Sequence, residues 1–365
     1  MTTVHTRYDI RIFRKMCLSL AKNGYNVNLL VADGLGYEIN SGVTIFDLGK
    51  PIGRLDRMLN VTKRLLKKAI EIDAEVYHFH DPELIPAARK LLKKGKIVIM
   101  DAHEDFPKQI LGKPYLKPYV KKALSIFFNM YENFATKGFS TIICATNTIG
   151  AKFTKFNKNV IVINNYPIVN ELFSKELLNQ DQRSKNVCYV GGISKIRGIE
   201  EIVNAAEKSV ELEKLVVAGN FNSKKLGEEI RKLEGWKKVE ELGSIDRNGV
   251  KNVLSKSIAG LVTFLPQENH IDSQPNKMFE YMSAGIAVIG SNFPLWKEII
   301  EVNDCGICID PLNPDEIANG IDYLILNPEV ASKMGMNGRK AVLDKYNWEK
   351  EEQKLFKAYE SLLIV

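Results

Sequence analysis

Residues 275–285 read Pro-Asn-Lys-Met-Phe-Glu-Tyr-Met-Ser-Ala-Gly, and this stretch indicates the architecture most clearly. An apolar run typical of a strand, Leu261–Leu265, precedes it, and a second such run, Ala287–Ser291, follows it. The segment Lys277–Ala284 between them has the pattern of a helix. A strand, a helix and another strand in this order predict parallel strands joined by a crossover helix.

Two acids accompany this helix. Asp272 stands eight residues before Glu280, so both carboxylates are expected near the helix start, beyond the carboxyl end of a strand. Open parallel sheets bind ligands at that place. Helix N-termini attract anions, and an added acid pair suits a ligand that also carries hydroxyl groups. We interpret the segment as part of a sugar-nucleotide site.

Short apolar runs alternate with amphipathic stretches, such as Ile12–Ala21 and Leu55–Ile70, along the whole chain. The strands expected in the first half are Val27–Val31, Val43–Phe46, Val76–Phe79, Ile97–Met100, Thr141–Ala145 and Val160–Ile163. Those expected in the second half are Val187–Val190, Leu215–Ala218, Val239–Leu242, Leu261–Leu265, Ala287–Ser291 and Ile307–Ile309. Strands separated by helices predict parallel sheets that are covered on both faces.

We therefore predict an α/β protein with two doubly wound, Rossmann-like domains and a cleft between them. The break is expected at Asn-Asn-Tyr-Pro, residues 164–167, because proline restricts its neighbour and ends a strand. The domains are residues 1–167 and 168–346. Residues 347–365 have a helical pattern with no strand after it, and we expect this helix to cross back to the first domain.

Composition favours a soluble globular protein, with 45% apolar and 26% charged residues. No window reaches the roughly 18 apolar residues of a membrane span, and the start lacks a signal-peptide pattern. We therefore expect a cytoplasmic location. Five cysteines, an odd number, predict reduced thiols, and the lone Cys305-x-x-Cys308 pair predicts buried cysteines rather than zinc ligands.

Positive charge is concentrated in the first half. Residues 1–167 contain 26 Lys and Arg against 14 Asp and Glu, or +12, and the remainder has 25 against 30, or −5. This asymmetry predicts an anionic partner for the first half. In residues 113–134, lysines accompany apolar and aromatic residues, which suits either an interfacial membrane helix or a buried helix with a solvated first turn. RNA binding is less favoured, because no nucleic-acid motif accompanies the charge.

A glycine-rich segment, residues 189–198, follows a strand and opens a helix near Ile199. Gly191 and Gly192 let the backbone approach a ligand, and Lys195 and Arg197 add positive charge, so the segment suits a diphosphate. A plain turn with solvated basic residues is the alternative. The spacing is neither Gly-x-Gly-x-x-Gly nor a P-loop, so a nicotinamide or ATP site is not favoured. Residues 33–36, Asp-Gly-Leu-Gly, are expected to form a loop.

Ionisable residues follow two strands of the first half. Residues 101–105, Asp-Ala-His-Glu-Asp, come directly after one, and this suits a cleft better than a core. We expect His103 to hydrogen-bond a bound sugar, with a structural role or a metal site as less favoured alternatives. His80 ends another strand and is open to either a functional or a structural role. Asp81 before Pro82 predicts a helix N-cap.

With these residues in hand, the chain resembles the retaining glycosyltransferases of the GT-B fold, in the large family 4. That family carries a Glu, seven residues and a second Glu, as Asp272 and Glu280 are spaced here. The likeness extends to the glycine loop, to the segment around His103, to Asn-Tyr-Pro at residues 165–167 and to residues 294–298, and covers nearly the whole chain.

The resemblance implies a role for each matching residue. Glu280 would hold the donor ribose, Asp272 the transferred sugar, and His103 would contact that sugar from the first domain. The residues that would bind the nucleotide diphosphate are Gly191, Gly192, Lys195, Arg197, Asn276 and Lys277. It implies front-face retention, in which the leaving phosphate helps to deprotonate the acceptor and the cations stabilise its charge. The sequence has no Asp-x-Asp, so we expect no metal and no further cofactor.

The chain departs from the family pattern at two places. Asp272 replaces the usual first Glu and shortens the reach by one methylene, which affects the expected sugar. The family also begins with an apolar strand before the loop that here starts at Thr2. We expect the first sheet to lose a central strand, and the natural start to lie upstream.

Relatives of this pattern commonly assemble O-antigen, capsule or exopolysaccharide, including lipopolysaccharide, on a lipid carrier. The resemblance thus implies transfer of a hexose or N-acetylhexosamine from a nucleotide sugar, most simply a UDP-sugar, to a lipid-linked saccharide. The enzyme would associate peripherally with the inner membrane face through its basic first domain, and would not bind nucleic acid. A nucleotide-sugar 2-epimerase of the same fold and a non-catalytic nucleotide-sugar-binding protein are the alternatives.

Overall fold

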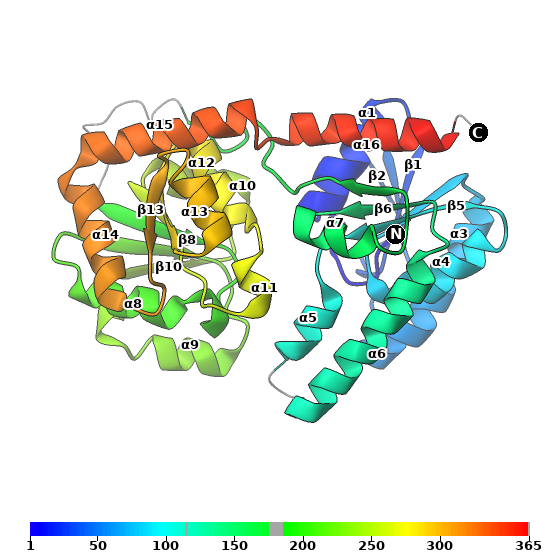
Figure 1. Cartoon of the computed structure of the whole chain (residues 1–365), viewed down its shortest axis with the longest axis horizontal. Coiled ribbons are helices and arrows are strands. Elements are labelled where there is room, and N and C mark those ends of the chain that lie inside the picture. The colour runs from blue at the N-terminus through cyan, green and yellow to red at the C-terminus, as the bar shows by residue number, and fades with distance from the viewer. Residues whose placement is uncertain (114–115, 175–184, 364–365) are drawn as a thin grey trace. The chain divides into compact units, whose positions relative to one another are not determined.

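The computed structural model describes residues 1–113, 116–174 and 185–363 of the chain. Within these residues the chain forms two compact units. The first comprises Met1–Asn165 and Glu349–Val365, and the second comprises Tyr166–Trp348. The predicted α/β class with parallel sheets is confirmed (Figure 1). Every strand expected from the sequence is present, with ends that differ by a few residues at most.

The second unit is built on a parallel sheet that has six strands among the described residues. Its strands are β8 (Asn186–Val190), β9 (Lys214–Ala218), β10 (Val239–Gly243), β11 (Ala259–Val262), β12 (Ala287–Ser291) and β13 (Gly306–Ile309). Their spatial order is β10-β9-β8-β11-β12-β13. The chain thus starts in the middle of the sheet, runs to one edge, returns and runs to the other. This is the order of the Rossmann fold.

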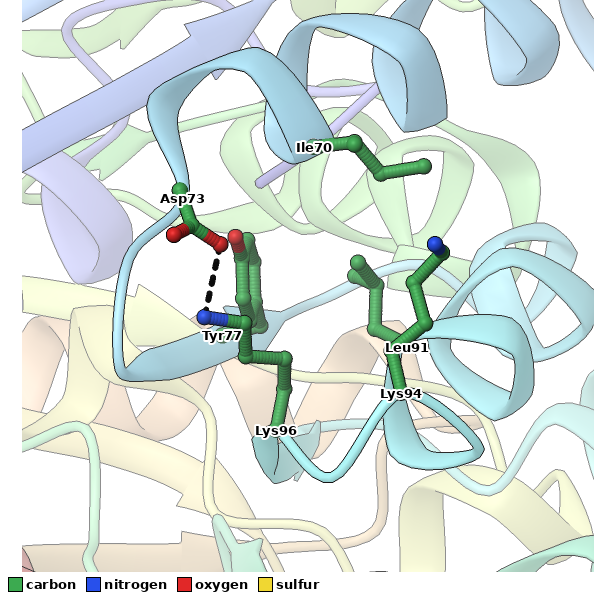
Figure 2. Close-up of a pocket in the computed structure, with 6 residues that line it drawn as sticks. All are labelled: Ile70, Asp73, Tyr77, Leu91, Lys94 and Lys96. Carbon is green, nitrogen blue, oxygen red and sulfur yellow. Dashed lines mark ion pairs between the residues drawn. The ribbon is translucent and has the colours of Figure 1, made fainter.

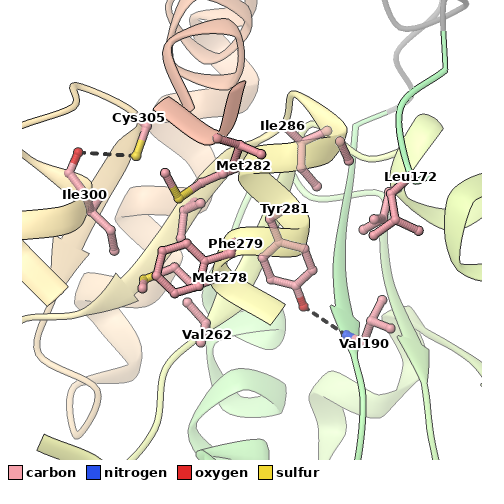
Figure 3. Close-up of a cluster of buried hydrophobic side chains, with 14 of the residues drawn as sticks. Leu172, Val190, Val262, Met278, Phe279, Tyr281, Met282, Ile286, Ile300 and Cys305 are labelled. Carbon is pink, nitrogen blue, oxygen red and sulfur yellow. Dashed lines mark hydrogen bonds between the residues drawn. The ribbon is translucent and has the colours of Figure 1, made fainter. Parts of the chain in front are cut away.

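Helices cover both faces of this sheet. They are η6 (Lys195–Arg197), α8 (Ile199–Lys208), α9 (Lys224–Ile230), η7 (Glu234–Lys238), α10 (Arg247–Ser255), α11 (Glu268–Ile271), α12 (Asn276–Ala284), α13 (Pro294–Ile300), α14 (Pro314–Leu326) and α15 (Pro328–Asp344). Successive strand residues point to opposite faces. Accordingly Cys188 and Val190 pack in one apolar cluster with α12, whereas Val187 and Tyr189 pack in the other with α8 and α14. Figure 3 shows the cluster around α12.

The first unit contains two sheets among the described residues. One consists of β1 (Val27–Val31), β2 (Glu38–Asn40) and β3 (Val43–Asp47) in the order β1-β3-β2, and its strand β2 was not predicted. The other consists of β4 (Val76–Phe79), β5 (Ile97–Ala102), β6 (Thr141–Cys144) and β7 (Val160–Val162), all parallel and in that order.

The residues that connect the two sheets are Met1 and Thr2. The Thr2 amide donates to the Leu30 carbonyl at 3.0 Å, on β1. On the other side, the His80 amide donates to the Met1 carbonyl at 3.2 Å, and the Met1 amine donates to the His78 carbonyl, on β4, at 2.8 Å. Met1 and Thr2 thus lie where the sequence analysis expects a central strand to be missing. The strands of the first unit form two separate sheets at that place.

The helices of the first unit are η1 (Ile10–Cys17), α1 (Leu18–Lys22), α2 (Arg54–Asp56), η2 (Arg57–Val61), α3 (Thr62–Ile72), η3 (Pro82–Leu84), α4 (Ile85–Leu92), α5 (Phe106–Leu111), α6 (Pro118–Thr136), α7 (Asn147–Phe153) and α16 (Trp348–Leu363). The segments η1 and η2 are π-helical, which the apolar pattern did not predict. Across the described parts of the chain, no helix combines the length and apolar content needed to cross a bilayer.

The C-terminal helix α16 packs on the first unit, as Figure 1 shows. The buried carboxylate of Glu351 accepts a hydrogen bond from the Asn164 amide at 2.8 Å. Near the other end of the helix, the buried Tyr359 hydroxyl lies 3.0 Å from Nδ1 of His78, on β4. These contacts confirm that the last helix returns to the first half of the chain.

Candidate functional site

The topology of the second unit places the candidate site. In a sheet of this order the ligand crevice lies outside the carboxyl ends of the strands, where the chain direction switches. That switch point is between β8 and β11. The segment after β8 carries Gly191 and Gly192, and the segment after β11 leads through Asp272 to α12. Both segments singled out in the sequence therefore start at the same crevice.

Glycines allow these two segments to approach closely. Gly191 leaves β8 with φ of +117° and donates its amide to the Ala218 carbonyl at 2.8 Å. Gly198 has φ of +75°, and a Cβ atom there would lie 2.1 Å from the carbonyl oxygen of Thr263. A side chain at Gly198 would therefore separate the loop after β8 from the segment after β11.

Lys277 is the most unusual side chain at this site. It is 7% exposed, and its Nζ atom has no hydrogen-bond partner among the described residues. The ammonium lies 3.4 Å from the centroid of the Tyr189 ring, and 3.6 Å from where a Cβ atom of Gly191 would be. Burial lowers the pKa of Lys277 well below its ordinary value, and the nearby Arg197 lowers it further. A buried lysine without a partner is costly unless an anion binds beside it.

Arg197 supplies a second positive charge at the same place. Its Nη1 atom donates to the Gly192 carbonyl at 2.9 Å. The guanidinium carbon of Arg197 and the ammonium of Lys277 each lie 5.5 Å from the centroid of Phe264. Two like charges that share one aromatic ring repel each other, and a phosphate group between them would relieve that repulsion.

The remaining predicted nucleotide-binding residues differ in their placement. Lys195 is exposed, and its Nζ atom lies 3.2 Å from a carboxylate oxygen of Glu200. Its side chain therefore points to α8 rather than to the site around Lys277. Asn276 is the exposed first residue of α12. Asp272 is exposed in the segment between α11 and α12.

Glu280 lies one helical turn after Lys277 and is held by an arginine that sequence reasoning missed. Its Oε1 atom accepts a hydrogen bond from Nη1 of Arg247 at 2.8 Å. The same guanidinium makes two hydrogen bonds to Glu171, at 2.5 and 3.1 Å. Arg247 is the first residue of α10, 33 positions before Glu280, and no motif connects the two.

Buried aromatic side chains hold α12 against the sheet. The Tyr281 hydroxyl accepts a hydrogen bond from the Val190 amide at 3.0 Å, at the end of β8 (Figure 3). Trp296, on α13, donates from Nε1 to the Ser273 carbonyl at 2.7 Å, and its ring packs on Phe264. The segment that carries Asp272 is therefore tied to the core beneath the cations.

In the first unit, the predicted residue His103 lies beside a buried charged cluster. Its Nδ1 atom is buried, has no hydrogen-bond partner among the described residues, and lies 3.6 Å from Oδ2 of Asp101. Asp101 accepts two hydrogen bonds from Arg11, at 2.7 and 2.8 Å. Burial raises the pKa of Asp101, but Arg11, His103 and His80 together lower the pKa to well below its ordinary value.

His80 belongs to this cluster. Its Nδ1 atom lies 2.8 Å from Oδ2 of Asp101, and burial lowers its pKa to about 4. Among the described residues, His78, His80 and Asp101 have the spacing of a metal-binding group. Both oxygens of Asp101 already accept hydrogen bonds from Arg11, so the guanidinium supplies the positive charge there.

As predicted, Pro82 opens η3 and Asp81 is the N-cap residue. Its side chain makes no capping hydrogen bond to the helix that follows. Instead, Oδ2 accepts hydrogen bonds from the amide of Thr3 at 2.5 Å, from the Thr2 hydroxyl at 2.9 Å and from the Val4 amide at 3.2 Å. These donors outcompete the helix amides, and Asp81 orders the first residues of the chain.

The first unit also has a hollow of about 290 Å³ near the starts of β4 and β5. Figure 2 shows its lining residues, among them Asp73 and Lys96, which form an ion pair at 2.7 Å. This is the amino end of the parallel sheet, whereas ligands bind at the carboxyl end. We therefore do not place the donor site there.

Two protein families match the chain, and they meet near the division between the units. The family described as Glycosyltransferase Family 4 matches residues 11–166, and the family described as Glycosyl transferases group 1 matches residues 170–341. This chain belongs to the GT-B glycosyltransferases of the family 4 type.

Curated relatives of this glycosyltransferase are distant in sequence. It is 28% identical over 180 residues to the uncharacterized glycosyltransferase MJ1607 of Methanocaldococcus jannaschii, covering 48% of the chain and 45% of the relative. It is 25% identical over 271 residues to MJ1069 of the same organism, covering 66% of each. It is 26% identical over 185 residues to spore coat protein SA of Bacillus subtilis, covering 48% of each. The matches thus span about half to two thirds of these relatives.

Solved structures support the fold of the glycosyltransferase. Sucrose-phosphate synthase of Thermosynechococcus elongatus superposes with a TM-score of 0.76 at 18% identity, covering 96% of this chain and 92% of that one. HepE of Anabaena, in complex with UDP and glucose, superposes with a TM-score of 0.72 at 13% identity, covering 99% and 98%. The GT-B fold class predicted from the sequence is thereby confirmed.

Proposed function

We propose that this glycosyltransferase moves a hexose or N-acetylhexosamine from a UDP-sugar to a lipid-linked saccharide in the synthesis of surface polysaccharide. The observation that carries the proposal is the buried ammonium of Lys277, which has no hydrogen-bond partner among the described residues and lies beside Gly191. The donor diphosphate would be its partner, together with Arg197.

The choice of a UDP-sugar is supported by structural neighbours. HepE of Anabaena has been solved with UDP and with UDP-glucose, and TarM with UDP and other ligands. The proposed donor base in this protein follows from that similarity. Glu280, held by Arg247, would accept hydrogen bonds from the ribose hydroxyls, and Asp272 from hydroxyls of the sugar. His103 is assigned to the transferred sugar.

The proposed reaction retains the configuration of the sugar. The bond between the anomeric carbon and the diphosphate oxygen breaks, the acceptor hydroxyl forms the new bond on the same face, and its proton passes to the leaving phosphate. Lys277 and Arg197 stabilise the negative charge that develops on that phosphate. Because the protein supplies this charge itself, the proposal includes no metal ion.

Calorimetric titration of the full chain with UDP-, GDP- and dTDP-sugars tests the proposal, together with transfer assays in EDTA. We expect a UDP-sugar to bind, and expect Lys277→Ala to lose that binding. The exposed Lys224, on α9, provides the matched control Lys224→Ala, which should bind normally. Equal donor affinity in Lys277→Ala, or loss of transfer in EDTA, would overturn the assignment.

A further inference from the structure

Helix α6 in the first unit has an apolar face that the other described residues leave exposed. Its inner side packs normally: the Phe128 ring lies 4.6 Å from the Phe106 ring, and the Ser125 hydroxyl donates to the Pro107 carbonyl at 2.9 Å. Its outer side carries Tyr119, Ile126, Phe127, Met130 and Phe134, which are between 53% and 70% exposed.

The exposed residues form one continuous stripe. Tyr119, Ile126 and Met130 follow each other at intervals of seven and four residues, which places them on one side of a helix. Phe127 and Phe134 repeat the interval of seven directly beside them. Single exposed apolar residues are ordinary on protein surfaces, but a contiguous stripe of five large ones indicates a binding surface.

Basic residues border the stripe where α6 begins. Lys117, Lys121 and Lys122 occupy its start, and Lys117 and Lys122 are exposed. The only acidic residue in the helix is Glu132, which is buried on the inner side and paired with Lys152 at 2.6 Å. The outer side of the helix is therefore apolar and positive.

Helix α4 extends the positive border at the other end of α6. The guanidinium carbon of Arg89 lies 4.7 Å from the centroid of the Phe134 ring. Lys93 and Lys94 are exposed just after α4. Exposed Lys137 follows α6 directly, and Figure 1 shows α4 beside that end of α6.

We propose that the outer face of α6 inserts shallowly into an anionic lipid membrane, with Phe127 and Met130 among the acyl chains and the lysines at lipid phosphates. An apolar stripe bordered by lysines is the pattern of a helix that lies in the membrane interface. A second copy of the chain is a poorer partner, because a symmetric contact would bring the lysine borders together. The inference rests on the proposed function in one respect, the lipid-linked acceptor. The observations that support it are those on α6.

Co-sedimentation of the full chain with vesicles tests this surface. We expect binding to phosphatidylcholine vesicles that contain phosphatidylglycerol, and little binding to phosphatidylcholine alone. Phe127→Glu with Met130→Glu should abolish it, whereas Ile52→Glu, at a residue that is 94% exposed elsewhere in the first unit, should not. Lys117→Gln with Lys122→Gln should weaken it about fivefold for each charge, and Lys224→Gln with Lys225→Gln should not.

Three outcomes would overturn the inference. The first is equal vesicle binding by the wild type and the Phe127→Glu, Met130→Glu variant. The second is equal binding to neutral and anionic vesicles, or binding unchanged in about 1 M salt, where screening acts over ~3 Å. The third is a dimer in sedimentation velocity that Phe127→Glu dissociates. Donor titration of the same variants separates the two proposals, because vesicle binding without UDP-sugar binding contradicts only the proposed function.

Discussion

The Nη1 atom of Arg247 lies 2.8 Å from Oε1 of Glu280, and the same guanidinium binds Glu171. All three side chains are less than one-fifth exposed, so their charges are poorly screened by water. Arg247 therefore fixes the orientation of the carboxylate proposed to hold the ribose. In the proposed site it would be a positioning residue that acts through Glu280.

Arg247→Gln should weaken donor binding by about tenfold, the effect of losing roughly one charge-assisted hydrogen bond that orients Glu280. Titration calorimetry with the UDP-sugar measures it. The control is Arg231→Gln, which breaks a more exposed arginine–glutamate pair, with Glu241, in the same unit. Arg247→Lys should restore part of the affinity, since it keeps one donor. Donor affinity equal to the wild type in Arg247→Gln would show that Glu280 is oriented without it.

Lys277→Met should have opposite effects on stability and binding. It removes a buried ammonium that lacks a hydrogen-bond partner among the described residues and keeps most of the side-chain volume, so the free energy of unfolding should rise by about 1 kcal/mol. Donor affinity should fall by about tenfold to a hundredfold with the lost charge. Urea unfolding and calorimetry check the two effects, and Lys224→Met is the control. A variant less stable than the wild type would mean that Lys277 has a structural role.

Gly198→Ala should destabilise the second unit by more than about 3 kcal/mol. The residue has positive φ, and the new Cβ atom would lie 2.1 Å from a backbone oxygen. The control Gly24→Ala has φ of +87° but open space around it, so only the backbone strain of about 1 kcal/mol applies. Urea unfolding compares them. Similar losses in the two variants would show that the close approach to Thr263 is relieved by a small shift.

Stability should fall when the pH is lowered from about 6.5 to 4. His80 has its pKa lowered to about 4 in the folded protein, so the unfolded chain takes up the proton first in this range. The loss from His80 alone is on the order of 3 kcal/mol. Urea unfolding at several pH values should show a shallower slope in His80→Asn. Equal slopes in both proteins would mean that His80 does not titrate as its burial requires.

Much of the fold followed from local patterns. The strands are short apolar runs with few competing interpretations, and Asp272 and Glu280 follow β11 in the predicted order of strand, helix and strand. Strand β2 was missed because it has only three residues, of which two are polar. The π-helical conformation of η1 was missed because apolar spacing does not distinguish a π-helix from an α-helix over so short a segment.

The site was harder to predict, because side-chain direction depends on the folded chain. Lys195 and Arg197 are equivalent in the sequence, but the turn at η6 directs Lys195 to Glu200 and Arg197 to Gly192. The importance of Lys277 depends on Tyr189, which is distant in sequence. A local clue to the position of Arg247 does exist, since Asp246 caps α10 and places the arginine in the first turn of that helix. Nothing in this segment indicates that the arginine pairs with Glu280.

The hydrogen bond from Trp296 to Ser273 gives the protein a built-in optical reporter. The indole contacts the peptide next to Asp272 and packs on Phe264, the ring shared by the two cations. The sequence contains three tryptophans, and the others are Trp236 and Trp348. Replacing these two with phenylalanine leaves a single emitter at the proposed donor site. Nucleotide-sugar binding could then be followed in real time by intrinsic fluorescence, without a label.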